Sequence, residues 1–154
     1  MDEGSRLDDN VVRLHASTGL QVLPVMENHE AAIIEALPLL RPSLQRDERN
    51  CDVDTALDQI RNGKVTLWMV RQEDKLVGTF TTVSLQHPQR KTLYIEHLGG
   101  KDLQSWMNEA LSTLRKLADY ANCSAITCDG RIGFARFAQD NGFKEMHRHF
   151  EMEL

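Results

Sequence analysis

A run of apolar residues at helical spacing between positions 103 and 121 constrains the fold of this chain more than any other feature. Its apolar side chains recur every three or four residues, so a single helix face can carry all of them. They are Leu103, Trp106, Met107, Ala110, Leu111, Leu114, Leu117, Ala118 and Ala121. Asp102 stands directly before the run and is the expected N-cap. The pattern predicts a long amphipathic helix that needs an apolar layer to pack against.

Strand-like segments on both sides of this helix can supply that layer. Residues 65–70, 75–85 and 92–98 are separated by short turns, which predicts an antiparallel meander. Residues 125–128 give a compact strand signal after the helix. Because a helical crossover returns the chain in the same direction, we expect 125–128 to pair parallel with 92–98.

The remaining segments complete a single domain over residues 19–154, after a flexible tail at residues 1–18. The expected elements, in order, are a strand at 20–25, a helix at 29–40 ended by Pro38 and Pro42, a helix from Asp52 or Asp54 to Asn62, a short helix from Arg131 or Ile132 to Asp140, and a strand at 143–152. The predicted fold class is therefore α/β, or mixed α+β. Its central sheet is mixed and mostly antiparallel, with six or seven strands and flanking helices.

The composition limits the kinds of protein this chain can be. With 154 residues it is expected to form one domain, and 18 Lys and Arg against 23 Asp and Glu give a net charge of −5. No sizeable basic cluster is present, which argues against nucleic-acid binding. No apolar run is long enough to cross a bilayer, so no membrane partner is expected. The three cysteines are expected to be reduced thiols, and the sequence shows no set of metal ligands.

Motifs in the second half of the chain resemble those of a known superfamily. Asn141-Gly142-Phe143 follows an amphipathic helix, while Leu98-Gly99-Gly100, Trp106 and Gly130-Arg131 precede it. Together with the order of strands and helices, these residues resemble the GNAT acyltransferase superfamily over residues 20–152. They are similar in particular to the small GNAT-like proteins of tailed bacteriophages and prophages. The resemblance implies a GNAT-like acyl-CoA N-acyltransferase fold, and a location in the cytoplasm of a bacterial host or in a virion.

The resemblance also implies that acetyl-CoA is the acyl donor, and where it binds. In GNAT proteins two parallel strands splay apart and bond the pantetheine arm, and amides at the start of the next helix receive the pyrophosphate. Here the splayed pair would be residues 94–98 and 126–129. The implied cofactor-binding residues are Leu98, Gly99, Gly100, Lys101, Asp102, Thr127 and Arg131. The turn at 98–102 is shorter than the glycine-rich turn usual in the superfamily.

The resemblance implies two catalytic residues, Glu96 and Tyr94. Glu96 lies on the strand where several GNAT enzymes place a general base for the attacking amine, and the alternative is an exposed carboxylate. Tyr94 is expected on the same face, where it could contact the substrate, donate a proton to the leaving thiolate, or simply be a half-buried sheet tyrosine. His97 is expected on the opposite face. Ala138 occupies the place of the tyrosine that often protonates the thiolate.

Two functions of different classes stay open at this point. The first is an acetyl-CoA-dependent N-acyltransferase of phage-associated type that acts on an amine. The second is a catalytically inactive GNAT-shaped binding module, such as a virion component or a host-factor inhibitor, which binds a protein partner. The short turn and Ala138 favour the second. Exposed sheet edges in such a small fold also allow a homodimer.

Overall fold

Five strands form one sheet in the order β1-β2-β3-β4-β5. The structure is a computed structural model in which residues 19–130 and 134–154 are described, so the expected tail at 1–18 lies outside the described residues. The strands are β1 (Leu20–Pro24), β2 (Thr66–Gln72), β3 (Lys75–Gln86), β4 (Lys91–Gly100) and β5 (Ala125–Cys128). Strands β1 to β4 pair antiparallel, and β5 pairs parallel with β4. The predicted meander, parallel crossover and mixed α/β class are confirmed.

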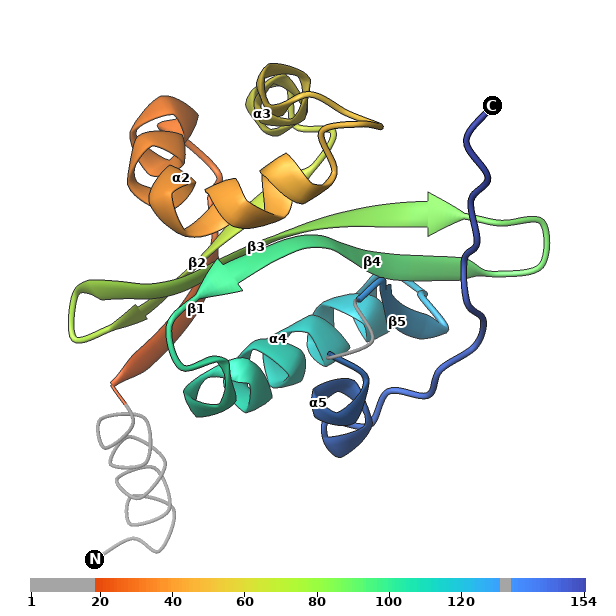
Figure 1. The fold of residues 1–154 in the computed structure, drawn as a ribbon. Helices are drawn as coiled ribbons and strands as arrows, with labels where there is room; N and C mark the ends of the chain where they lie inside the picture. Colours follow the sequence, from red (N-terminus) through yellow and green to blue (C-terminus); the bar gives the residue numbers. More distant parts are fainter. Residues whose placement is uncertain (1–18, 131–133) are drawn as a thin grey trace, which may run out of the picture.

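Helices cover both faces of the sheet (Figure 1). On one face lie α2 (His29–Arg46) and α3 (Val53–Arg61), and on the other lie α4 (Met107–Tyr120) and α5 (Ala135–Asp140). The centre of β2 is therefore buried on both of its faces. Trp68 and Val70 belong to the core under α4. Leu67 and Met69 belong to the core under α2 and α3. A strand buried on both faces is apolar at every position. The sheet therefore has two hydrophobic cores, one for each helical layer.

Helix α2 continues past its predicted end at residue 40 and contains both Pro38 and Pro42. A proline inside a helix removes one backbone hydrogen bond and costs about 3 kcal/mol. Both prolines are exposed, whereas the opposite face of the helix buries Ile33, Ala36, Leu40 and Leu44. Burial of that face outweighs the cost of the prolines, and the carbonyls that they leave unpaired lie on the side open to water. The prediction that the prolines end this helix is wrong.

The long helix begins later than its N-terminal signal predicts. Asp102 has a left-handed backbone (φ 49°) and its side chain makes no capping hydrogen bond. It precedes a short 3-10 helix, η1 (Leu103–Ser105), and α4 starts only at Met107. The backbone carbonyl of Asp102 accepts hydrogen bonds from the amide and the hydroxyl of Ser105, which stabilises the 3-10 turn. The amphipathic helix is therefore confirmed, but Asp102 is not its N-cap.

Residues 143–154 form no strand, so the predicted final strand is wrong. The segment runs past the sheet toward the loop between α2 and α3 (Figure 1), where Arg49 pairs with Glu151 at 3.0 Å and with Glu153 at 2.8 Å. Phe150 is 86% exposed and Met152 is 84% exposed. Alternating residues form a stable strand only where one face packs on a core, and here Phe143 packs against the core under α4 but the later apolar side chains do not. The described residues consequently give a sheet of five strands, fewer than the six or seven expected.

Candidate active site

Strands β4 and β5 separate partway along their length. They pair in register from Thr92 with Ala125 to Ile95 with Cys128, where β5 ends. Beyond Ile95, β4 runs on to Gly100 and pairs only with β3 on its other side, among the described residues. The expected separation of residues 94–98 from residues 126–129 is present only in part, because Tyr94 and Ile95 still pair with β5 and the strands separate only from residue 96 onward. This wedge leaves the β5 side of residues 96–100 open to an added strand-like ligand.

A β-bulge in β4 sets the direction of the side chains at the mouth of this wedge. In the β3–β4 register Thr81 pairs with His97 and Thr82 pairs with Ile95, so Glu96 is an extra residue without a partner on β3. A bulge interrupts the usual alternation of side chains. As a result, Glu96 and His97 both face the α2–α3 side of the sheet, and their side chains touch. The expectation that His97 faces away from Glu96 is wrong, because strict alternation does not hold across the bulge.

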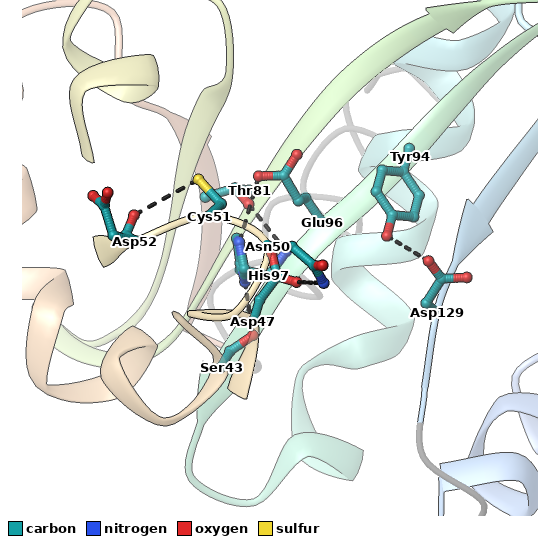
Figure 2. A network of polar contacts seen from close by, with 10 residues as sticks. All are labelled: Ser43, Asp47, Asn50, Cys51, Asp52, Thr81, Tyr94, Glu96, His97 and Asp129. Atoms are coloured by element: carbon teal, nitrogen blue, oxygen red, sulfur yellow. Dashed lines mark hydrogen bonds and ion pairs between the residues drawn. The ribbon is translucent and has the colours of Figure 1, made fainter. Parts of the chain in front are cut away.

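His97 is the buried centre of a small polar network (Figure 2). Its side chain is only 5% exposed, and its Nδ1 lies 2.9 Å from the hydroxyl of Ser43 on α2. Its backbone amide donates to Thr81 Oγ1 at 3.0 Å, and its Nε2 lies 3.4 Å from Glu96 Oε1. The histidine thus joins α2, β3 and the candidate base in one cluster.

Carboxylates surround the outer side of this cluster. The pKa of the Cys51 thiol is raised, first by burial and then by the negative charges of Asp52, Asp47 and Glu96. Asp47 accepts a hydrogen bond from the Asn50 side chain at 3.0 Å within the α2–α3 loop (Figure 2). Carboxylates gathered this closely favour a positively charged ligand.

Tyr94 connects the two strands just before they part. Its hydroxyl donates a hydrogen bond of 2.7 Å to Asp129 Oδ2, immediately after β5 (Figure 2). Its pKa is raised well above the ordinary value, mainly by burial, then by the bond to Asp129 and by the charges of Asp129, Glu96 and Asp47. The phenol therefore keeps its proton at neutral pH, and that proton points at a carboxylate. This arrangement suits a group that orients a substrate better than one that protonates a thiolate.

The glycines of the expected phosphate turn are required by packing. A Cβ on Gly99 would lie 1.9 Å from the carbonyl oxygen of Leu39 in α2, and a Cβ on Gly100 would lie 2.6 Å from that of Val77. The amide of Lys101 donates to the Val77 carbonyl at 3.0 Å. That amide is therefore not free to bind a phosphate. The exposed side chains of Lys101 and Asp102 face water, and Leu98 packs against the core under α4.

The other expected cofactor residues lie at the edges of the wedge. Thr127 pairs with Tyr94 in the hydrogen-bonded part of the β4–β5 ladder, one residue before the strands separate. Arg131 lies outside the described residues. Burial, followed by the charge of Asp129, raises the pKa of Cys128 to about 11. Cys128 is therefore a protonated thiol at neutral pH, which makes it a poor nucleophile.

Residues from the α2–α3 region were missed by reasoning from sequence. Ser43 and Asp47 come from a stretch between the two predicted helices, at 29–40 and from Asp52 or Asp54, for which the sequence predicts no element. Their contacts with β4 span more than 40 positions along the chain, and no local pattern encodes them.

The described residues contain no group of three His, Cys, Asp or Glu side chains that could hold a metal ion. Within the same ranges, no helix is long and apolar enough to span a membrane.

No family model and no curated protein matches this sequence. Solved structures do match the fold. An aminoglycoside acetyltransferase from an uncultured soil metagenomic sample, solved with sisomicin, has a TM-score of 0.66 and 14% identity over 90% of this chain and 98% of its own. A ribosomal-protein-alanine N-acetyltransferase from Brucella melitensis biovar Abortus 2308 has a TM-score of 0.65 and 13% identity over 88% and 99%.

A predicted acetyltransferase from Clostridium acetobutylicum, solved with acetyl-CoA, is similar as well, with a TM-score of 0.63 and 14% identity over 87% of this chain and 96% of its own. All three cover most of this chain and nearly all of their own. Identities this low establish the fold alone. The chain has the GNAT acetyltransferase fold, and its chemistry has to be argued from the site.

Proposed function

We propose that this protein is an N-acetyltransferase that transfers the acetyl group of acetyl-CoA to a primary amine. The observation that carries the proposal is the end of β4–β5 pairing at Ile95 and Cys128, while β4 runs on to Gly100. A thin arm with amide groups can add to the open side of β4 as a strand does. That placement would bring its thioester to the bulge, next to Glu96.

Glu96 is the proposed general base. Its side chain faces the cleft side of the bulge, near Asp47 and Cys51, where an ammonium group would be attracted. Glu96 takes a proton from the amine, whose nitrogen then attacks the thioester carbonyl. The C–N bond forms, the C–S bond breaks, the nitrogen loses its second proton to solvent, and the thiolate gains one proton from solvent. A backbone amide of Leu98 or of the adjoining strand would stabilise the oxyanion.

Tyr94 is proposed to orient the acceptor at the mouth of the wedge. Its hydroxyl is already bound to Asp129, and its raised pKa makes it a poor donor to a thiolate. For the nucleotide end, the side chain of Lys101 supplies a positive charge. The amides of Asp102, Leu103 and Gln104 have no backbone partner among the described residues, which leaves them as donors for a phosphate.

Calorimetry and a thiol-release assay test the proposal. We expect acetyl-CoA to bind with micromolar affinity, and turnover with at least one amine from a panel of sisomicin, a peptide with N-terminal alanine and spermidine. Glu96→Gln should lower kcat by ~10²-fold or more while leaving acetyl-CoA affinity within about twofold. The matched control is Glu27→Gln, an exposed carboxylate on the β1–α2 connection. Equal loss in both variants would remove Glu96 from the role of base.

A GNAT-shaped binding module remains the second candidate, as a phage virion component or host-factor inhibitor. Three observations favour it: the packing role of Gly99 and Gly100, the Lys101 amide already bonded to Val77, and Ala138 in place of a tyrosine acid. No binding at millimolar acetyl-CoA by the folded protein would support this candidate and reject the transferase.

A further inference from the structure

The imidazole of His97 is a buried ionisable group that the proposed mechanism does not use. Both of its ring nitrogens have polar neighbours, Ser43 on one side and Glu96 on the other. These neighbours come from different elements, because Ser43 lies on α2 and Glu96 on the bulge of β4. A buried histidine with two such contacts is fixed in orientation on both edges of its ring.

The chemistry of the two neighbours determines which nitrogen carries the proton. An ionised Glu96 carboxylate can only accept, so the nitrogen facing it, Nε2, carries a hydrogen. Nδ1 of the neutral ring then accepts a hydrogen bond from the Ser43 hydroxyl at 2.9 Å. If the ring becomes charged, the same hydroxyl turns and accepts from Nδ1–H. In both states the Nε2–H group faces Glu96.

We propose that His97 positions Glu96 for proton abstraction, with Ser43 holding the imidazole ring in place. This inference rests on the proposed transferase function, in which Glu96 is the base. Nε2 and Glu96 Oε1 are 3.4 Å apart, longer than an ordinary N–H···O bond, and contacts of this kind shorten when substrate binds. A donor held at this point keeps the carboxylate turned toward the wedge.

The bulge is what makes this pairing possible. On a regular strand adjacent side chains point to opposite faces, so neighbours in sequence cannot meet in one pocket. The extra residue at 96 brings both onto the α2–α3 side. Other polar and titratable groups lie near the pair on every element packed against it. They are Ser43, Asp47 and Cys51 from the α2–α3 region, Thr81 of β3, Tyr94 of β4, and Asp129 after β5.

Substitutions at His97 test the role through kinetics. His97→Leu fills similar space without a donor, and we expect kcat to fall by ~10–100-fold with the KM for acetyl-CoA within about twofold. The acid limb of the kcat/KM profile should also move to higher pH. His97→Gln places an amide N–H near the position of Nε2 and should restore most of the rate and the wild-type profile. His87→Gln is the matched control, since His87 also contacts a hydroxyl, that of Thr92 at 3.2 Å, outside the site.

Nitrogen NMR of the intact, substrate-free wild-type protein gives an independent readout, even if a variant fails to fold. We expect His97 to be the Nε2–H tautomer when neutral, with Nδ1 showing the shift of a hydrogen-bond acceptor. An Nδ1–H tautomer overturns the positioning role at any level of activity. A wild type that turns over and needs Glu96, combined with a His97→Leu profile equal to wild type, overturns this inference alone. A wild type that neither binds nor turns over acetyl-CoA overturns the proposed function, and the role of His97 with it.

Discussion

Replacing Gly99 with alanine tests whether the glycine pair at the end of β4 serves packing. The added Cβ would lie 1.9 Å from the Leu39 carbonyl oxygen and 2.7 Å from its carbon. For the first contact to reach an ordinary 3.4 Å, α2 has to move away from β4 by about 1.5 Å. Backbone cannot rotate away as a flexible side chain does. The backbone of Gly99 itself is not left-handed, so the whole cost of the substitution is steric.

Overpacking against a flexible core costs ~1–3 kcal/mol, and a contact with helix backbone belongs at the upper end of this range. With a urea dependence of about 2 kcal/mol per molar, a loss of about 3 kcal/mol lowers the unfolding midpoint by about 1.5 M. Urea unfolding followed by tryptophan fluorescence measures this, because Trp106 and Trp68 are both buried.

The control variant is Gly63→Ala. Gly63 has a left-handed backbone (φ +79°) but no atom within 4 Å of the added Cβ, so only backbone strain of about 1 kcal/mol is expected. Its midpoint should fall by about 0.5 M. If Gly99→Ala unfolds at the same urea concentration as wild type, the packing explanation of this glycine is refuted. Its original assignment to phosphate binding would then regain support.

Three further predictions concern Tyr94, Cys128 and Pro38. Because the folded state raises the pKa of Tyr94, its contribution to stability is complete below the ordinary value of about 10 and is lost as pH rises above it. Urea unfolding free energies should fall above that pH, and Tyr94→Phe should remove this part of the slope; an unchanged slope contradicts the account. Cys128, with a pKa of about 11, should react with iodoacetamide at pH 8 about a hundredfold more slowly than free cysteine, and comparable rates by mass spectrometry would exclude its burial. Pro38→Ala restores an amide in α2 and should raise the unfolding free energy by ~1–2 kcal/mol, whereas a lower melting temperature would mean that the proline is favourable in its helix.

Local patterns predicted most of the fold correctly. The apolar spacing from residue 103 to residue 121 identified the helix that covers one face, and the short turns identified the meander. The parallel pairing of β5 followed from the length of the crossover helix alone. In each case the deciding information lies within a few residues of the element that it describes.

The failures arose where a distant partner decides the outcome. Pro38 and Pro42 are strong local stop signals, yet the buried face of α2 overrides them. Residues 143–152 alternate as a strand does, but beyond Phe143 their apolar side chains Met146, Phe150 and Met152 are exposed. Local sequence is not sufficient in such cases, because the surface against which an element packs is formed by residues elsewhere in the chain.

The candidate site was predicted in part for the same reason. Glu96 and Tyr94 could be identified from their place on a strand, but the partners Ser43 and Asp129 depend on how α2 and β5 meet that strand. The contact between Glu96 and His97 depends on a bulge, which is a relation between two strands and has no signature in either one.

The bulge also has an evolutionary consequence. Because Glu96 is the residue that β3 leaves unmatched, a chain without it would keep the same ladder, with Ile95 and His97 still opposite Thr82 and Thr81. The pairing of β3 with β4 does not use this residue. Loss of a single codon would therefore remove the candidate base while leaving every paired residue of this ladder in place. On this strand, the proposed acetyltransferase and a protein of the same shape without its base are one small genetic step apart.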